Sequence, residues 1–381
     1  MNFGTESIRL HAKHKGKFSV KSKLPIRNKK ELSIAYTPGI GTVSLAVAKN
    51  PKLANSLTAK HNMVAVVSDG SSVLGLGNIG PLGALPVMEG KAILFKEFAD
   101  IDAVPIVLNS QDPDEIVKAV EYIAPTFGGI NLEDIAAPKC FYIEEQLRSK
   151  LNIPVMHDDQ HGTAMVVLAA LSNALKVVEK SMEEVKIVVN GAGSAGTAIV
   201  KLLKLAGAKN LLLVDTTGII YNSRPHLSTE KKELARITNP KKIKGDLAVA
   251  LQDADVFIGV SRGGLVSESM VTRMNKKAII FALANPIPEI MPDEAKRGGA
   301  MVVATGRSDF ANQINNVLIF PGFFRGLLDS NQTAIKSNMY LNAAKALAGL
   351  IKKPKKDLII PQVFDKRVVK VVSRAVSERF V

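Results

Sequence analysis

A strand, a glycine-rich turn and a helix follow one another closely in this chain, and they constrain its fold more than any other segment. The apolar run VKIVVN at 185–190 leads into GAGSAG at 191–196, after which a helical pattern begins. A second apolar run, NLLLVD, ends at Asp215, 19 residues after Gly196. Strand, loop, helix, strand and terminal acid in this order are typical of a βαβ dinucleotide-binding unit.

The residue types inside the turn match the chemistry of such a unit. Gly191 permits the tight turn, Gly193 lets the backbone approach a pyrophosphate, and Gly196 lets the helix pack closely on the strand. Ser194 and Ala195 stand where the helix begins, and a helix N-terminus favours negative charge. We therefore predict that these five residues bind a dinucleotide.

The acid that ends the second strand bears on which dinucleotide is bound. A carboxylate at Asp215 accepts hydrogen bonds from the adenosine ribose hydroxyls and repels a 2′-phosphate. We therefore expect NAD to be preferred over NADP. Lys and Arg residues nearby can offset this preference, so NADP stays open.

Two acidic pairs form a second informative feature. Glu133 and Asp134 stand in NLEDIAAP, and Asp158 and Asp159 stand in MHDDQHGTA, each beside an apolar stretch. Unpaired carboxylates at the ends of buried elements are costly, so a positive partner is expected between them. A divalent cation such as Mg²⁺ or Mn²⁺ prefers such oxygens, whereas helix capping or pairing with lysines is the alternative. Two such pairs, each followed by small residues, favour the cation.

The pattern of apolar segments indicates an α/β protein with two domains. We expect a catalytic domain over 1–160, a Rossmann-like doubly wound domain over 161–325, and a lysine-rich helical segment over 326–381. The last segment is expected to pack back on the first domain or on a partner subunit. The predicted strands of the first domain lie at 62–70, 102–109, 128–136 and 153–159, and its helices at 90–99, 115–125 and 140–150. Both acidic pairs then lie at carboxyl ends of strands, where open α/β sheets bind their ligands.

Composition places the chain among globular proteins. It has 381 residues, of which 46% are hydrophobic and 22% charged, and no apolar run is close to the roughly 20 residues of a membrane span. The start MNFGTESIRL lacks the features of a signal peptide. We expect a cytoplasmic protein without a membrane partner, in which the single cysteine, Cys140, is a small core residue.

The net charge of +15 is concentrated at the two ends of the chain. Residues 9–30 carry nine Lys and Arg and no acid, and residues 351–381 carry nine bases against three acids. Neither segment has the aromatic pattern of a nucleic-acid-binding surface. We interpret the charge as a solvated surface that attracts anionic substrates or cofactor, and we expect no nucleic-acid partner.

Eight motifs in sequence resemble the malic enzyme family in its short prokaryotic form. They are YTPGI at 36–40, SDGSSVLGLGNIG at 68–80, MEGKAILFKEFADID at 88–102, NLEDIAAP at 131–138, HDDQHGTA at 157–164, NGAGSAG at 190–196, ALANP at 282–286 and NNVLIFPG at 315–322. The resemblance implies oxidative decarboxylation of L-malate to pyruvate and CO₂ with reduction of NAD or NADP. It also implies a homodimer or a larger even assembly.

The resemblance implies roles for residues that match the family's motifs. Lys91 matches the general base for the malate hydroxyl, and Tyr36 matches the general acid. Glu133, Asp134 and Asp159 match the three metal ligands. A lysine acts as a base near neutral pH only if burial or another cation depresses its pKa, and we expect a site beside Mg²⁺ to provide this for Lys91.

Four further residues are implied by the same motifs. Asp158 matches an acid that supports the catalytic site, while Asn285 and Asn316 match amides that contact the substrate. Asn285 also belongs to the expected cofactor site, and Asn315 is a neighbouring substrate candidate.

One loop departs from the pattern of larger family members. They carry an arginine that binds a malate carboxylate and the cofactor, whereas this chain has Ser71 and Ser72 there. The carboxylate anchor is therefore open, with Arg27, Lys96 and the backbone amides of 75–80 as candidates.

Alternative readings remain for the site and for the function. His157 and His161 have the i, i+4 spacing of a helical zinc pair, but no third ligand is evident. A malolactic enzyme of the same fold would use NAD and metal yet release lactate. A non-catalytic nucleotide sensor or nucleic-acid-binding protein is the rival from another class, and it has no need for Lys91, Tyr36 and the metal carboxylates together.

Overall fold

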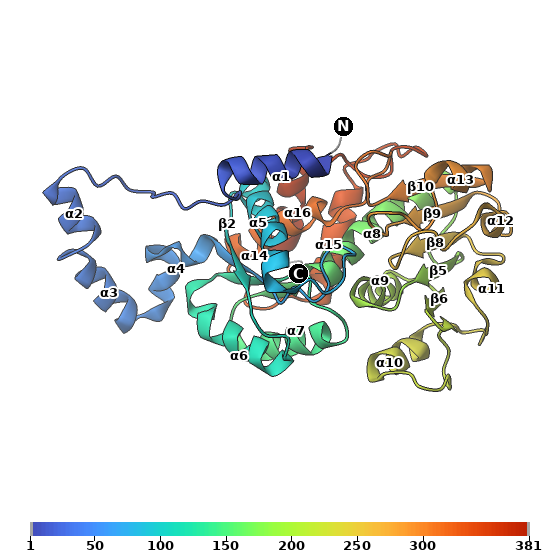
Figure 1. The fold of residues 1–381 in the computed structure, drawn as a ribbon, viewed down its shortest axis with the longest axis horizontal. Helices are drawn as coiled ribbons and strands as arrows, with labels where there is room; N and C mark the ends of the chain where they lie inside the picture. Colours follow the sequence, from blue (N-terminus) through green and yellow to red (C-terminus); the bar gives the residue numbers. More distant parts are fainter. Residues whose placement is uncertain (1–2, 379–381) are drawn as a thin grey trace.

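The chain folds around two separate sheets of mainly parallel strands (Figure 1). The computed structural model describes residues 3–378. The first sheet has four strands in the order β2-β1-β3-β4, and the second has six in the order β10-β9-β8-β5-β6-β7. The α/β class and the Rossmann-like second sheet that the sequence predicts are confirmed.

The first sheet is entirely parallel, as its nearly continuous apolar strands predict. Its strands are β1 (Met63–Ser68), β2 (Asp102–Val107), β3 (Gly129–Leu132) and β4 (Val155–His157). The helices between them are α5 (Gly80–Ala99), α6 (Pro113–Ile123) and α7 (Lys139–Lys150), with the short turn η3 (Ala124–Thr126). Because β3 and β4 are neighbours and run in parallel, the two acidic pairs that follow them leave the sheet at the same edge.

The second sheet has the arrangement of a doubly wound domain. Its strands are β5 (Lys186–Asn190), β6 (Asn210–Asp215), β7 (Gly218–Ile219), β8 (Val256–Gly259), β9 (Ala278–Ala282) and β10 (Ala300–Thr305). Its helices are α9 (Ser194–Leu205), α10 (Thr229–Ile237), α11 (Leu247–Leu251), α12 (Glu268–Val271) and α13 (Pro292–Arg297). The chain order reverses between β5 and β8, where such sheets bind ligands.

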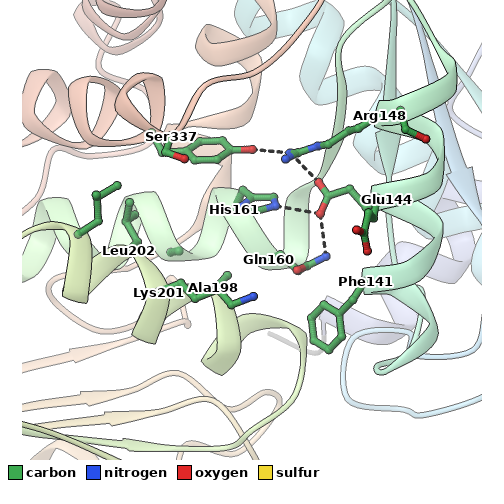
Figure 2. Close-up of a pocket in the computed structure, with 14 residues that line it drawn as sticks. Phe141, Glu144, Arg148, Gln160, His161, Ala198, Lys201, Leu202 and Ser337 are labelled. Carbon is green, nitrogen blue, oxygen red and sulfur yellow. Dashed lines mark hydrogen bonds and ion pairs between the residues drawn. The ribbon is translucent and has the colours of Figure 1, made fainter. Parts of the chain in front are cut away.

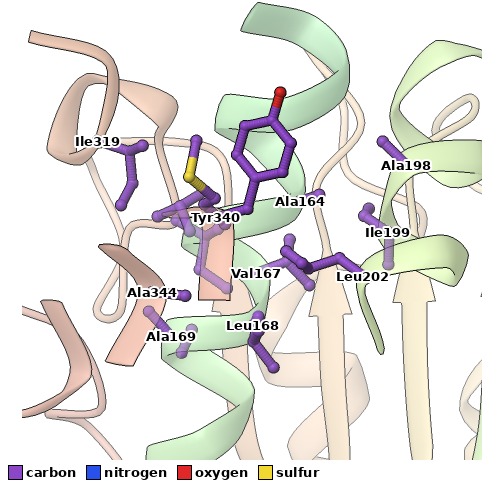
Figure 3. Packing of buried hydrophobic residues seen from close by; sticks show 14 of the residues in the cluster. Ala164, Val167, Leu168, Ala169, Ala198, Ile199, Leu202, Ile319, Tyr340 and Ala344 are labelled. Carbon is purple, nitrogen blue, oxygen red and sulfur yellow. The ribbon is translucent and has the colours of Figure 1, made fainter. Parts of the chain in front are cut away.

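Helix α8 (Asp158–Val178) connects the two sheets and is the central core element. Its residues Ala164 and Val167 pack beside α9 and the C-terminal helices in a shared apolar cluster (Figure 3). The helix is long and apolar enough to cross a membrane, but 72% of its most apolar window is buried inside the protein. It is therefore a core helix, and its first turn carries Asp158 and Asp159.

The C-terminal helices return to the first half of the chain. They are α14 (Phe320–Asp329), α15 (Ser337–Ala348) and α16 (Arg367–Ser377), preceded by the short turn η4 (Asn316–Leu318). Helix α14 contacts α5, α15 contacts α8, and α16 packs on both α14 and α15. The expected domain limits at 160 and 325 stay predictions, because α8 and these helices join the two halves through one core.

The N-terminal region has two parts with different surroundings. Helix α1 (Phe3–His14) lies beside α5, whereas α2 (Lys29–Ala35) and α3 (Ile40–Lys49) project away from both sheets (Figure 1). The chain returns through η1 (Pro51–Leu53), α4 (Ala54–Leu57) and η2 (Ala59–Asn62). No residue of α2 or α3 is buried, and we call residues 29–49 the N-terminal arm.

Candidate active site

The two acidic pairs meet at the carboxyl ends of β3 and β4. Glu133 and Asp134 follow β3, and Asp158 and Asp159 open α8 directly after β4. The backbone N–H of Asp134 donates a hydrogen bond to Oδ2 of Asp159, with N and O 2.8 Å apart. Residues 25 positions apart in the sequence are thus neighbours in the fold.

Lys91 is inserted between these two pairs. It lies on α5 with only 7% of its surface exposed. Its Nζ is 2.8 Å from Oε1 of Glu133 and 2.5 Å from Oδ2 of Asp158. The ammonium also lies 4.0 Å from the centre of the Phe320 ring, a favourable cation–π position. Lys91 is therefore held by one acid from each pair.

The neighbouring carboxylates determine the direction in which the pKa of Lys91 is shifted. Burial by itself lowers the pKa of Lys91, but the charges of Asp158 and Glu133 more than offset burial and raise it above its ordinary value. The acidic pairs therefore favour the protonated form of Lys91, and the depressed pKa expected beside a metal cation stays a prediction. The physical reason is that Lys91 is the only cation among several buried carboxylates in this part of the described structure.

The carboxylates are destabilised as anions. Burial raises the pKa of Asp158 to about 7, with a further rise from Glu133 and a partial offset from Lys91. Burial likewise raises the pKa of Asp159 to about 6, partly offset by Lys91. The pKa of Glu133 is also raised, mainly by burial. One lysine is thus not enough positive charge for this cluster.

Asp134 has the most unfavourable environment of the acidic residues. Burial and the charges of Asp159 and Glu133 raise the pKa of Asp134 to about 9. Within residues 3–378, its Oδ2 atom is buried and has no hydrogen-bond partner. Its φ of 54° lies in the left-handed region, which Asp tolerates better than most residues. An uncompensated carboxylate oxygen held in this way indicates a missing cationic partner.

The residues fit a divalent cation that prefers oxygen ligands. Glu133, Asp134 and Asp159 all line one cavity and supply carboxylate oxygens, the donors that Mg²⁺ and Mn²⁺ favour. Among the described residues, no three His, Cys, Asp or Glu side chains already form a compact ligand cluster. Lys91 holds Glu133 and a backbone amide holds Asp159, so these side chains must turn to bind a cation together.

The two histidines in this region do not form a zinc site. His157 is fully buried, and burial lowers its pKa to about 4. His161 instead places Nε2 2.9 Å from Oε2 of Glu144, as Figure 2 shows. The two imidazoles thus have different surroundings, and the rejection of a zinc pair stays a prediction.

A cavity of about 760 Å³ opens beside Lys91 between the two sheets. It is lined by residues from both halves of the chain. Nine predicted site residues line it, namely Lys91, Glu133, Asp134, Asp159, Ser194, Ala195, Asn285, Asn315 and Asn316. The expected carboxylates, dinucleotide turn and amides therefore face one space, with Asp158 fully buried behind Lys91.

Loops from the two sheets touch across this cavity. A Cβ atom on Gly75 would lie 2.4 Å from the carbonyl oxygen of Asn285, so only glycine permits this approach. Ser72 donates its backbone N–H to the carbonyl of Asp134, with N and O 3.0 Å apart. Ser71 turns away and accepts a hydrogen bond from the backbone N–H of Ala136. The serines thus order the loop, and neither replaces the positive charge of an arginine.

The dinucleotide turn has the geometry that its glycines predict. Gly191 has a φ of 119°, a conformation that favours glycine. A Cβ atom on Gly196 would lie 1.7 Å from the carbonyl oxygen of Gly191, so the helix packs tightly on the turn. Gly193 precedes α9, and a Cβ atom there would meet nothing within 4 Å, which leaves its backbone open to a ligand. This arrangement fits a pyrophosphate at the start of α9.

Asp215 ends β6 as predicted, but its carboxylate already accepts hydrogen bonds from neighbouring side chains. Arg224 bonds both carboxylate oxygens, Lys231 lies 2.7 Å from Oδ2, and Thr217 donates to Oδ1. Burial raises the pKa of Asp215, but hydrogen bonds from Arg224 and Lys231 outweigh burial and hold the pKa below its usual range. The two cations weaken the expected repulsion of a 2′-phosphate, so the preference for NAD stays a prediction.

Tyr36 is a predicted site residue that does not lie in the cavity of its own chain. It ends α2 on the N-terminal arm, is 66% exposed, and does not line the cavity. Figure 1 shows α2 well away from α8 and the second sheet. Its own chain therefore does not bring Tyr36 to Lys91 in this structure.

The candidate carboxylate anchors also need correction. Arg27 pairs with Glu31 on the exposed side of the arm, and Lys96 pairs with Asp100 and Asp102. Neither side chain lines the cavity, although Gly75 of the 75–80 loop does.

Five further residues that the sequence analysis did not predict line the cavity, namely Ser7, His11, Lys17, Thr163 and Ser261. The only signal for Lys17 was its place in the basic run at 9–30, which has no local pattern that distinguishes one lysine from another.

A second cavity, of about 750 Å³, is lined by residues of α7, α8, α9 and α15 and contains a polar network (Figure 2). Glu144 accepts hydrogen bonds from Arg148, His161 and Gln160 and from the backbone N–H of His157. The last three donors belong to the junction of β4 and α8. Glu144 therefore fixes the segment that presents Asp158 and Asp159, a supporting role that the sequence did not reveal.

Comparison with known proteins identifies the family. The profile of the malic enzyme N-terminal domain matches residues 15–148, and that of the malic enzyme NAD-binding domain matches residues 160–380. The bifunctional malic/malolactic enzyme of Bacillus subtilis is 52% identical over 381 residues, covering 99% of this chain and 93% of that protein. The NAD-dependent malic enzyme of Geobacillus stearothermophilus is 52% identical over 365 residues, covering 95% of this chain and 76% of that protein.

A solved structure leads to the same family. The NAD-dependent malic enzyme of Thermotoga maritima superposes with a TM-score of 0.95 at 51% identity, covering 97% of this chain and 98% of that one. The eight motifs, the two domain profiles and this fold agree. The chain therefore belongs to the malic enzyme family.

Proposed function

We propose that this protein oxidises and decarboxylates L-malate to pyruvate and CO₂ while reducing NAD or NADP, with Mg²⁺ or Mn²⁺ as the metal. The observation that carries the proposal is the single cavity in which Lys91 and the acidic pairs face the start of the dinucleotide helix α9. The assignment also rests on family membership and on the names of the relatives. It does not depend on the preference between the two cofactors.

The described side chains divide the work of binding. Glu133, Asp134 and Asp159 would hold the metal, and the turn at Gly193 and Ser194 would hold the pyrophosphate. The metal, when bound, supplies positive charge beside the C2 oxygen, and the nicotinamide accepts the hydride from C2. Substrate is thereby placed between the acidic pairs and the second sheet.

Lys91 and Asp158 are placed to move a proton. The acidic pairs by themselves hold the proton on Lys91, so in our proposal the charge of a bound metal would be needed to favour the neutral amine. Lys91 would then pass a proton to Asp158 across their 2.5 Å contact and take the proton of the malate C2 hydroxyl. Hydride leaves C2 as the C2 oxygen becomes a carbonyl. Loss of CO₂ from C4 then leaves the electron pair on C3 and the C2 oxygen, and C3 must receive a proton to give pyruvate. Lys91 lies beside C2 in this scheme, so a different acid is required at C3.

Tyr36 would supply that proton, and this requires a second copy of the chain. The segments on either side of the N-terminal arm are anchored to the body, by an ion pair of Lys23 with Asp102 before it and by hydrogen bonds from Lys60 to the carbonyls of residues 124, 125 and 127 after it. Between these anchors the arm extends from the body and presents apolar side chains to solvent. They are Leu32, Ile34, Tyr36, Ile40 and Leu45. An apolar projecting arm is suited to a two-fold dimer in which each chain covers its partner.

We therefore propose a homodimer in which the arm of one chain delivers Tyr36 to the cavity of the other. A cytoplasmic location and the absence of a nucleic-acid partner belong to the same proposal. The location is supported by the globular composition and by the single cysteine, Cys140, which is buried. The absence of a nucleic-acid partner is supported by the two basic end segments, which lack the aromatic pattern of a nucleic-acid-binding surface.

The direct test is turnover by the purified chain. With L-malate and Mn²⁺ present, NAD or NADP should be reduced, and pyruvate should form in equal amount to the reduced cofactor. If neither cofactor is reduced, while the protein is folded by circular dichroism, the proposed function is wrong.

A malolactic reaction is the second candidate, because the Bacillus subtilis relative is named a bifunctional malic/malolactic enzyme. Here the product is lactate and the cofactor is not consumed overall. Measuring lactate and pyruvate in the same reaction mixture separates the two activities. Accumulation of lactate without net reduction of NAD would identify the malolactic reaction.

A further inference from the structure

The N-terminal helix contributes to the active-site cavity although no predicted site residue lies on it. Helix α1 lies beside α5 (Figure 1), and Ser7, His11 and Lys17 line the cavity next to Lys91. The last of these residues follows the helix in a turn at Gly16, whose φ is 101°. This turn reverses the chain so that Lys17 faces α5.

Lys17 is fixed against the helix that carries Lys91. Its backbone N–H donates to Oε2 of Glu89, with N and O 2.9 Å apart. Its Nζ donates to the carbonyl oxygen of Pro86, also at 2.9 Å. A Cβ atom on Gly90 would lie 3.4 Å from this Nζ, an ordinary contact distance, so the ammonium lies directly beside residue 90. Lys17 is thus positioned beside the residues that immediately precede Lys91.

The ammonium of Lys17 has capacity for a ligand. An ammonium has three N–H donors, and Pro86 is the one acceptor that the described residues supply to Nζ. Burial lowers the pKa of Lys17, and the charge of Glu89 partly offsets this effect. A cation that is partly removed from water and has unused N–H donors is stabilised by hydrogen bonds to an anionic ligand.

Few cationic groups are available to an anion in this cavity. Among the described residues that line it, the side chains able to carry positive charge are Lys17, Lys91 and His11. Lys91 is already paired with Glu133 and Asp158. His11 bonds the carbonyl oxygen of Ser7 through Nδ1 at 2.7 Å, while its buried Nε2 has no partner within residues 3–378. Because Nδ1 is the donor to this carbonyl, Nε2 of His11 can donate to an anion only when the ring is protonated. Lys17 is therefore the main group free to bind an anion, and a protonated His11 is the second.

The reaction determines which carboxylate such a group should hold. Malate carries one carboxylate at C1, which remains in pyruvate, and one at C4, which leaves as neutral CO₂. A cation bound to C4 would stabilise the charge that has to be lost and would slow the reaction. A cation bound to C1 stabilises the ground state and the transition state alike, which lowers KM without reducing kcat.

We propose that Lys17, assisted by His11, binds the C1 carboxylate of malate. This inference rests on the proposed function and supplies the carboxylate anchor for which Ser71 and Ser72 carry no positive charge. Lys17 acts here as a substrate-binding residue and takes no part in moving protons or hydride. The N-terminal turn is then part of the substrate site.

The test compares Lys17→Gln, Lys17→Arg and His11→Gln with Lys21→Gln, which removes an exposed charge from the same basic segment. Pyruvate is used as a product inhibitor because it retains C1 and lacks C4. Its binding to the Mn²⁺-loaded protein with NADH is also measured by calorimetry, a readout that does not depend on turnover. The melting temperature of each variant shows whether it is folded.

For Lys17→Gln we expect the malate KM and the pyruvate dissociation constant to rise together, by about 10- to 100-fold, as for a lost charge-assisted hydrogen bond. The kcat and the KM for NAD should stay within about threefold of the unaltered protein. Lys17→Arg should recover most of the affinity, His11→Gln should show a smaller loss, and Lys21→Gln should match the unaltered protein.

Three outcomes would overturn the inference. They are an unchanged malate KM, a raised KM for NAD alone, and a raised malate KM with unchanged pyruvate binding, which would place Lys17 at C4. If the unaltered protein does not turn over malate, the proposed function fails instead, and pyruvate binding still reports on Lys17 separately.

Discussion

Gly162 leaves the space that the side chain of Asp158 occupies. A Cβ atom on Gly162 would lie 1.8 Å from Oδ1 of Asp158, four residues earlier on α8. The carboxylate therefore lies against its own helix beside residue 162, with Oδ2 directed at Nζ of Lys91. Only glycine at 162 is compatible with this orientation, which makes a residue without a side chain part of the catalytic geometry.

Gly162→Ala should reduce turnover by about 100-fold, because the methyl group displaces Asp158 from Lys91, and small misplacements of catalytic groups have effects of this size. The measurement is kcat with saturating malate, Mn²⁺ and NAD. Gly349→Ala is the control, since a Cβ atom there would be no closer than 3.3 Å to its nearest neighbour. Retained turnover in Gly162→Ala would show that Asp158 does not need this position.

Asp134→Asn should abolish stabilisation by the metal. In the unaltered protein, Mn²⁺ at 100 times its dissociation constant should add about 2.7 kcal/mol to the free energy of unfolding. Because the pKa of Asp134 is raised to about 9 without metal, its carboxyl is mostly neutral at pH 7. The amide then replaces a neutral group of the same shape, so with a chelator the variant should be about as stable as the unaltered protein. Urea unfolding with Mn²⁺ or EDTA measures both effects.

The matched control for the metal is Asp293→Asn, which alters an exposed acid on α13 and should respond to Mn²⁺ normally. If Asp134→Asn gains the same stability from Mn²⁺ as the unaltered protein, Asp134 is not a metal ligand.

Lys231→Glu should lower the ratio of kcat/KM for NADP to kcat/KM for NAD by about tenfold. Lys231 is the more exposed of the two cations on Asp215, at 32% of its side chain, and so is the one able to meet a 2′-phosphate. Initial rates with both cofactors give the ratio. Lys232→Glu, which places the same charge on the exposed face of α10, should leave it unchanged. Equal ratios in both variants would rule out a role for Lys231.

Glu144→Gln should destabilise the protein by about 3 kcal/mol at pH 7, because it leaves Arg148 and His161 without their buried counterion. Burial raises the pKa of Glu144, but His161 and Arg148 outweigh burial and hold it at about 2, below the ordinary 4.5. The carboxylate therefore adds stability above pH 4.5, and this stability is lost as the pH falls toward 2.

The difference in unfolding free energy between the unaltered protein and Glu144→Gln should accordingly narrow between pH 5 and pH 3, as measured by urea unfolding. Glu145→Gln, which changes the exposed neighbour, should show little difference at any pH. A difference that is constant with pH would mean that the charge of Glu144 is not what stabilises the network.

If the arm of each chain delivers Tyr36 to the cavity of its partner, two inactive variants should restore activity when they form a mixed dimer. A mixed dimer of Lys91→Ala and Tyr36→Phe has one cavity with both residues intact if Tyr36 acts in the partner. After co-expression with different tags and purification through both, this dimer should show about half the activity of the unaltered dimer. Activity is measured as reduction of NAD with malate and Mn²⁺.

The control dimer pairs Lys91→Ala with Asp158→Asn. Both residues belong to the body of the same chain, so each cavity carries one defect and no activity should return. If the dimer with Tyr36→Phe is equally inactive, each Tyr36 serves its own chain and the proposed exchange is wrong.

The sequence predicts well those features that are local in the chain. The turn from Gly191 to Gly196 and the placement of Glu133 and Asp159 after strands follow from short patterns with a direct physical meaning. Parallel order then brings the acidic pairs to the same edge of a sheet. Little beyond these patterns is needed to locate the site.

The features that sequence reasoning missed depend on contacts between distant elements. The pKa of Lys91 is raised because α5 inserts it between residues that follow β3 and β4. Asp215 is neutralised by Arg224 from a loop and Lys231 from α10, neither of which belongs to the βαβ pattern. Tyr36 has the expected motif, but the direction of its arm is set by packing that no local pattern encodes.

Arm exchange between two chains, if it occurs, would also determine when the protein becomes active during its synthesis. If each cavity obtains its proton donor from another chain, a newly made polypeptide can fold around both sheets and bind cofactor while remaining inert toward malate. Turnover then begins only when two finished chains meet, so the onset of activity depends on protein concentration. Dilution below the dimer dissociation constant should switch the enzyme off without unfolding it.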